Sequence, residues 1–177
     1  MYLLIRHQQP KAYFLYTVID KGAPMMNSTT EDSVCLFSAM CGIITVNQQP
    51  QAHLTLTRTA QWQGIEIDTT VTDADGYFEF PSMFVKNRKK FQTSTFLVTQ
   101  NIFTDFGNKN IRLWLGSKLF PQEFSESRGE IISVRGELTE REKSYSINSQ
   151  VFLTLFDWAV VTDSISASLN TFNLTIN

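Results

Sequence analysis

The sequence predicts an all-β fold, organised as a mainly antiparallel β-sandwich. The chain has 14 Phe, 3 Trp and 5 Tyr, and it is also rich in Thr, Ile and Val, which are the residues that strands favour. Apolar and polar residues alternate over short runs, and Gly, Pro, Asn and Asp separate these runs. A length of 177 residues suits one well-buried domain.

The first half of the domain contains short runs with a period of two, from Cys35 to Phe80. Turn residues separate the runs, as in the segment 48–50. One face of each run is apolar and the other is polar, which is typical of strands that bury one side. The residues that we expect in the core are Leu54, Leu56, Ile67, Phe78 and Phe80.

The second half continues in the same style, with runs at 93–103, 110–115, 130–138 and 150–158. In the run 110–115, alternation places Trp114 on the polar face beside Arg112. The run 150–158 is apolar on both sides, which favours a central strand.

The stretch TVTDADGYFEF contains two aspartates and a glycine between two strand patterns. An EF-hand loop with this Asp-Gly pair would begin at Val71 and end at Ser82, and neither residue is a carboxylate. Asp initiates turns through its side chain and Gly supplies positive φ. We therefore predict a structural hairpin turn at Asp73, Asp75 and Gly76, and no metal site.

The chain divides into an N-terminal extension or linker at 1–33, one sandwich domain at 34–161, and a polar tail or edge strand at 162–177. The apolar run 12–19 is too short to span a bilayer, and no small-residue cleavage site follows it. We expect neither a transmembrane segment nor a signal peptide, which slightly favours the cytoplasm. The net charge of −2 indicates no nucleic-acid surface.

The two cysteines, Cys35 and Cys41, are six residues apart in a segment with an extended pattern. Their Cα atoms would be about 20 Å apart, which exceeds the reach of a disulfide. We expect two free thiols, which are typical of a reducing compartment. No cluster of His and Cys accompanies them at metal-ligand spacing, so we expect no zinc site.

The segment GIITVNQQPQAHLTLTR, together with TTVTDADGYFEF, resembles the carboxypeptidase-regulatory-like, transthyretin-like repeat. The chain departs from that pattern at Gln49, where Gly is common, and at Leu54, where Ala is usual. From Cys35 to about Leu138 it also resembles a bacterial domain-of-unknown-function family built on that repeat. The resemblance implies a prealbumin-like or immunoglobulin-like sandwich that acts as an accessory or binding module without catalytic residues. The matching residues are Gly42, Pro50, Thr72, Asp73, Gly76, Phe78 and Phe80.

Three residues are candidates for an interaction surface. Trp114 is predicted to be exposed, where it marks a contact surface or covers the end of the sandwich. Arg58 and Trp62 either form a cation–π pair that faces a ligand or pack a loop locally. His53 is expected at the surface, because no acidic partner accompanies it in the sequence.

The sequence favours a non-enzymatic interaction module that needs no cofactor and binds a protein. One alternative is a partner of a secretion or toxin system, such as an immunity protein. Another is a hydrolase of the transthyretin-related kind, which resemblance would associate with several histidines and a Tyr-Arg-Gly-Ser terminus. This chain has 2 His and ends FNLTIN, so we do not expect that activity.

Overall fold

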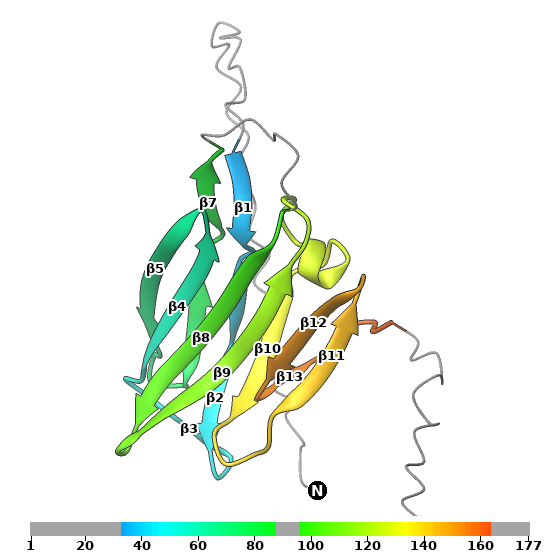
Figure 1. Ribbon diagram of the computed structural model, residues 1–177. Helices are drawn as coiled ribbons and strands as arrows, with labels where there is room; N and C mark the ends of the chain where they lie inside the picture. Colours follow the sequence, from blue (N-terminus) through cyan, green and yellow to red (C-terminus); the bar gives the residue numbers. More distant parts are fainter. Residues whose placement is uncertain (1–32, 88–95, 164–177) are drawn as a thin grey trace, which may run out of the picture.

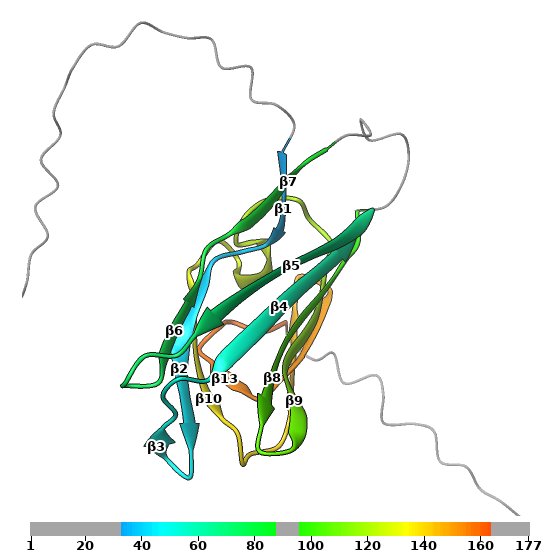
Figure 2. The ribbon, with the colours of Figure 1, turned by 90° about the vertical axis from the view of Figure 1, so that its left-hand side faces the viewer.

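A computed structural model describes residues 33–87 and 96–163 of the chain. These residues form two packed β-sheets and a short two-stranded ribbon, without any α-helix (Figures 1 and 2). The one helical element described is a 3₁₀ turn, η1 (Ser125–Ser127). The predicted all-β sandwich is therefore confirmed. Apart from Ser33, the extension predicted at 1–33 lies outside the described residues, and so does the tail from 164 onward.

The large sheet has six strands in the order β11-β12-β9-β8-β4-β5. Every neighbouring pair in it is antiparallel, and β4–β5, β8–β9 and β11–β12 are hairpins. It ends at β5 on one side and at β11 on the other (Figure 1). Its strands are β4 (Thr55–Trp62), β5 (Gly64–Val71), β8 (Val98–Phe106), β9 (Lys109–Lys118), β11 (Lys143–Ile147) and β12 (Gln150–Thr154).

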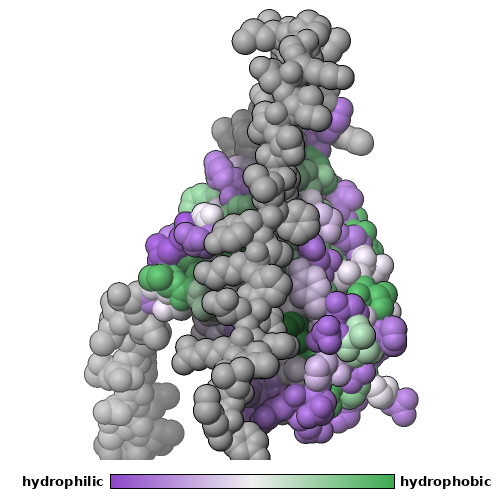
Figure 3. Space-filling model, turned by 180° about the vertical axis from the view of Figure 1, so that it is seen from behind, coloured by the Kyte–Doolittle hydropathy of each residue, from purple (hydrophilic) through white to green (hydrophobic). Residues whose placement is uncertain are grey.

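The small sheet is built around β2, which pairs with β10 on one side and with β3 and β6 on the other. The pairing of β2 with β10 is parallel, whereas its other pairings are antiparallel. Figure 3 shows the molecule from behind the view of Figure 1. On the coloured part of this surface, polar and apolar residues are mixed in small patches. The strands are β2 (Met40–Val46), β3 (Gln49–Pro50), β6 (Tyr77–Phe80), β10 (Ile132–Glu137) and β13 (Phe156–Trp158).

A two-stranded ribbon lies at one end of the sandwich. It pairs β1 (Ser33–Phe37) with β7 (Met83–Lys86) in antiparallel fashion (Figure 1). Residues of β1, of β4 and of the start of β8 with the segment before it form a small apolar cluster at this end. The cluster members are Val34, Leu36, Ala60, Phe96 and Val98, with Trp62, Met83 and Val85 packed against them.

The core between the sheets confirms four of the five expected core residues. Leu54, Leu56, Phe78 and Phe80 are buried. The expectation for Ile67 is wrong, since its side chain is 64% exposed. β5 is an edge strand whose apolar face points away from the small sheet, and its opposite face turns Asp68 toward the buried Arg58.

Trp114 is buried in the core, so the prediction that it is exposed is wrong. The cause is a β-bulge. Ile102 of β8 lies opposite Trp114, whereas the next residue, Phe103, lies opposite Arg112, so Leu113 is an extra residue in β9. The bulge shifts the alternation by one position and turns the indole inward. There its ring centroid is 5.0 Å from that of Phe152.

The TDADG turn is not a hairpin, because β5 belongs to the large sheet and β6 to the small one. The turn instead carries the chain from one layer to the other. Asp73 Oδ1 accepts hydrogen bonds of 2.9 Å from the backbone N–H groups of Asp75 and Tyr77. Gly76 has φ of 73°, and a Cβ there would lie 2.5 Å from the carbonyl oxygen of Ile44. Asp73 and Gly76 thus shape the turn through a side chain and a positive φ, whereas Asp75 contributes its backbone N–H.

The run 150–158 is two strands rather than the single central strand predicted. β12 lies inside the large sheet and β13 at the edge of the small one, with a bend at Leu155 between them. Tyr145 closes the sandwich on this side. Its hydroxyl donates to the carbonyl of Phe156 and accepts from the backbone N–H of Trp158.

Two tight turns are held by carboxylates that lie outside the turns themselves. Asn47 and Gln48 have positive φ, and their backbone N–H groups donate to Glu137 at 3.0 and 2.9 Å. Asn148 and Ser149 also have positive φ, and they donate in the same way to Asp163 at 2.9 and 3.0 Å. These carboxylates offset part of the cost of left-handed backbone at non-glycine residues.

Candidate interaction surface

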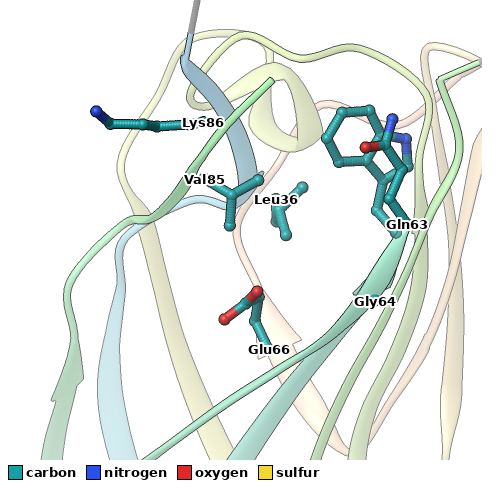
Figure 4. Close-up of a pocket in the computed structure, with 7 residues that line it drawn as sticks. Leu36, Gln63, Gly64, Glu66, Val85 and Lys86 are labelled. Carbon is teal, nitrogen blue, oxygen red and sulfur yellow. The ribbon is translucent and has the colours of Figure 1, made fainter. Parts of the chain in front are cut away.

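The side of the sandwich opposite Tyr145 contains a cleft of about 340 Å³. It lies where the turn between β4 and β5 faces the β1–β7 ribbon (Figure 4). We call this site the Trp62 cleft. Its lining residues are Leu36, Trp62, Gln63, Gly64, Glu66, Val85 and Lys86.

Trp62 is fixed in the wall of the cleft by the hairpin and by an aromatic contact. It is the last residue of β4 and lies opposite Gly64, while Gln63 between them has φ of 44°. The indole centroid is 5.3 Å from the ring centroid of Phe96. The side chain is half-buried, so one part of the ring is held and the rest remains accessible.

The cleft combines an apolar floor with polar groups around it. Leu36 and Val85 supply aliphatic side chains from the ribbon, whereas Gln63 and Glu66 supply an amide and a carboxylate from the hairpin (Figure 4). An apolar centre with a polar rim is the common composition of protein interaction sites. This arrangement suits binding of a side chain, and it contains no evident nucleophile paired with a base among its lining residues.

Arg58 is buried and does not form a cation–π pair with Trp62, so the alternative of a ligand-facing pair is wrong. Its side chain is fully buried, with its guanidinium carbon 5.0 Å from the ring of Phe37 and 4.6 Å from that of Phe80. Its Nε and Nη2 donate to Asp68 at 2.9 and 2.5 Å, and Nη2 also donates to the carbonyl of Pro81. Arg58 thus ties the β4–β5 hairpin to the β6–β7 connection, within a strand rather than a loop.

The other tryptophans lie in the core. Trp114 has no exposed surface and Trp158 only 6%. All three tryptophans of the chain are described, and Trp62 is the most exposed of them, with a half-buried side chain. Of the three predicted interaction residues, the structure therefore leaves Trp62 accessible and buries Arg58 and Trp114.

A buried polar network under the η1 turn was not predicted from the sequence. Lys118 and Glu126 form an ion pair without solvent exposure. Glu126 Oε2 accepts from the hydroxyl of Ser38 at 2.7 Å, and its Oε1 accepts from Gln100 at 2.8 Å. The only sign of this network in the sequence is Lys118 at the end of an alternating run, and this pattern does not identify Glu126 as its partner. The network joins β1, β8 and β9 to the η1 turn.

The cysteines are both free, as predicted. Burial raises the pKa of the Cys35 thiol to about 11, so this side chain stays protonated at neutral pH.

His53 is exposed, in a turn before β4 rather than on a strand. No group of three His, Cys, Asp or Glu side chains within residues 33–87 and 96–163 could hold a metal ion.

Within the described parts of the chain, no helix has the length and apolar character needed to cross a membrane. Neither the curated proteins nor the solved structures contain a match to the sequence. Residues 40–141, which are more than half of the chain, match a family of protein domains. The match includes the hairpin of the Trp62 cleft but not β1, β11, β12 or β13. The chain belongs to this family, described as Domain of unknown function (DUF6795).

Proposed function

We propose that this chain is a non-enzymatic binding module that holds a protein partner at the Trp62 cleft. The observation that carries the proposal is the state of Trp62, which packs on Phe96 while part of its indole stays accessible beside a cleft. A tryptophan held in this way loses little side-chain entropy on binding and offers a large contact area. Tryptophan is also enriched among the residues that dominate binding energy.

The composition of the cleft supports a protein partner. Its apolar floor at Leu36 and Val85 can receive an aliphatic or aromatic side chain. The exposed carboxylate of Glu66 and the amide of Gln63 can accept hydrogen bonds from a partner at the rim. The fold supplies a rigid scaffold, and the site lies at a turn, where recognition residues commonly occur.

The states of the possible catalytic residues favour binding over catalysis. The Cys35 thiol is buried, with its pKa raised by burial. Exposed His53 occupies a turn away from the residues that line the cleft. These observations support a module without covalent chemistry.

We also propose that the module is a divergent carboxypeptidase-regulatory-like repeat. The glycine at position 42 supports this assignment, because a Cβ there would lie 2.3 Å from the carbonyl oxygen of Val134. The backbones of β2 and β10 approach so closely at this point that the position requires glycine. A solved structure of this chain that differs in strand order from such repeats would contradict the assignment.

Iodide quenching of tryptophan fluorescence measures occupancy of the cleft. In the free protein, we expect iodide to quench Trp62 and to spare Trp114 and Trp158, which are buried. The folded variant Trp62→Phe should therefore lose most of the quenchable emission. A partner bound at the cleft should protect the wild-type protein from iodide, and unchanged quenching in a saturated complex would contradict the proposal.

A tagged full-length chain, cross-linked in its native host, can identify the partner. We expect Trp62→Ala to lose the specific partner, since truncation of an interface tryptophan typically costs about 2 kcal/mol or more. Tyr77→Ala is the matched control, because Tyr77 is an exposed aromatic residue outside the cleft. Equal capture by folded Trp62→Ala and wild-type protein would refute the proposed site.

A further inference from the structure

β5 is an edge strand with an exposed apolar row. Ile65, Ile67 and Val71 share its outward face, and their side chains are 62%, 64% and 54% exposed. Among the described residues, no strand pairs with the outer side of β5 (Figure 2). Its backbone N–H and C=O groups on that side are therefore available to another strand.

β5 lacks several of the features that usually protect an edge, although Glu66 and Asp68 place two charges on its inner face. It is eight residues long, whereas strands average about five to six residues. It contains no Lys or Pro, and its ladder with β4 runs without a bulge from Val71 to Gly64. By contrast, β11 at the other edge has five residues and begins at Lys143, which forms an ion pair with Asp157.

We propose that β5 pairs antiparallel with β5 of a second copy of this chain. A two-fold axis perpendicular to the sheet keeps the apolar rows of both copies on the same outer face. With Asp68 on the axis, Ile65 of each copy lies opposite Val71 of the other. The two large sheets then continue into one another through seven residue pairs, 65–71 on each strand.

Charge and the number of residue pairs together favour this register. With Ile67 on the axis, Glu66 would face Asp68 of the second copy, and with Glu66 on the axis, the two Glu66 carboxylates would face each other. Like charges directly opposite are destabilising. With Asp68 on the axis, Glu66 faces Thr70. The two Asp68 side chains then lie opposite each other, but each carboxylate is paired with the buried Arg58 guanidinium of its own chain, which offsets their repulsion. A shift in the other direction, with Thr69 on the axis, leaves only the five pairs of residues 67–71.

The dimer should be weak. A single strand pair with one apolar row is smaller than a standard interface of about 1,200–2,000 Å². We therefore expect a dissociation constant on the order of 10–100 µM. The association needs no partner at the Trp62 cleft, so purified protein tests it separately from the proposed function.

Sedimentation equilibrium of the full chain from about 5 to 500 µM spans this expected dissociation constant. The apparent mass should rise from 20.2 kDa toward twice that value. Ile67→Lys should weaken association at least about tenfold, because two ammonium groups then lie near the axis. Val151→Lys is the matched control, since Val151 is also an exposed apolar residue of the large sheet, but lies on β12. A monomer throughout, or equal loss in both folded variants, would overturn the proposal.

Cysteine cross-linking tests the register in a Cys41→Ser background. Ile65→Cys mixed with Val71→Cys should give an oxidised heterodimer. Each variant alone should not, because the two copies of position 65 would be about 20 Å apart, beyond disulfide reach. Equal cross-linking of the single variants would overturn this register. A monomer with β5 amides protected from hydrogen exchange would indicate that another segment of the same chain covers the strand, and would overturn the dimer.

Discussion

Replacement of Asp68 by Asn removes the charge partner of the buried Arg58. The guanidinium has no exposed surface, and Asp68 accepts its Nε–H and Nη2–H. Loss of one partner from a fully buried ion pair costs about 3–5 kcal/mol. The Asp68 side chain is 34% exposed, so solvent screens part of this interaction, and we expect a loss of about 2 kcal/mol in the free energy of unfolding.

Urea unfolding, followed by tryptophan fluorescence, measures this loss from the midpoint and slope. The matched control is Glu142→Gln, which breaks the exposed ion pair with Arg112 and should cost less than about 1 kcal/mol. The double variant Arg58→Met with Asp68→Leu should be less destabilised than Asp68→Asn, because no buried charge is left unpaired. If Asp68→Asn costs no more than Glu142→Gln, the argument that Arg58 depends on Asp68 is wrong.

Three further outcomes are expected. Asp73→Ala should destabilise by about 1–2 kcal/mol, because two backbone N–H groups lose their acceptor, whereas Asp75→Asn should be silent in the same urea titration; the reverse ranking would contradict the turn geometry. Hydrogen bonding, first from the Thr139 side chain, lowers the pKa of Glu137 to about 2. The stability that this carboxylate contributes is therefore complete above its ordinary pKa of 4.5 and is lost as the pH falls from 4.5 toward 2. Glu137→Gln should flatten this part of the acid unfolding curve, and an unchanged curve would refute the argument. The fragment 40–141 should show no cooperative thermal transition by circular dichroism, since it lacks β1, β11, β12 and β13, and a sharp transition would show that it folds alone.

Alternation in the sequence predicted burial well where a strand has a partner sheet on one side. Phe78 and Phe80 follow the expected pattern because β6 lies against the large sheet through its apolar face. The same rule failed for Ile67, because period two identifies two faces but not which one meets the second layer. That choice depends on Asp68 pairing with Arg58, a contact between two strands that alternation does not encode.

The position of Trp114 depends on a bulge that the sequence does not announce. Leu113 is the extra residue in β9, and nothing in its type distinguishes it from an ordinary strand residue. The Trp62 cleft was predictable only in part. Trp62 was identified from its residue type, but Leu36 and Val85 reach it from a ribbon whose pairing is set by tertiary packing.

The parallel pairing of β2 with β10 has a consequence for synthesis of the protein. Met40 lies opposite Ile132, so the two partners are 92 residues apart in the chain (132 − 40). During translation β2 leaves the ribosome long before β10, and its unpaired side remains open throughout that interval. Such distant pairings form slowly and leave partly folded chains prone to aggregation. The hairpins of the large sheet can form as they emerge, whereas the small sheet should close only after β10 and β13 have been synthesised.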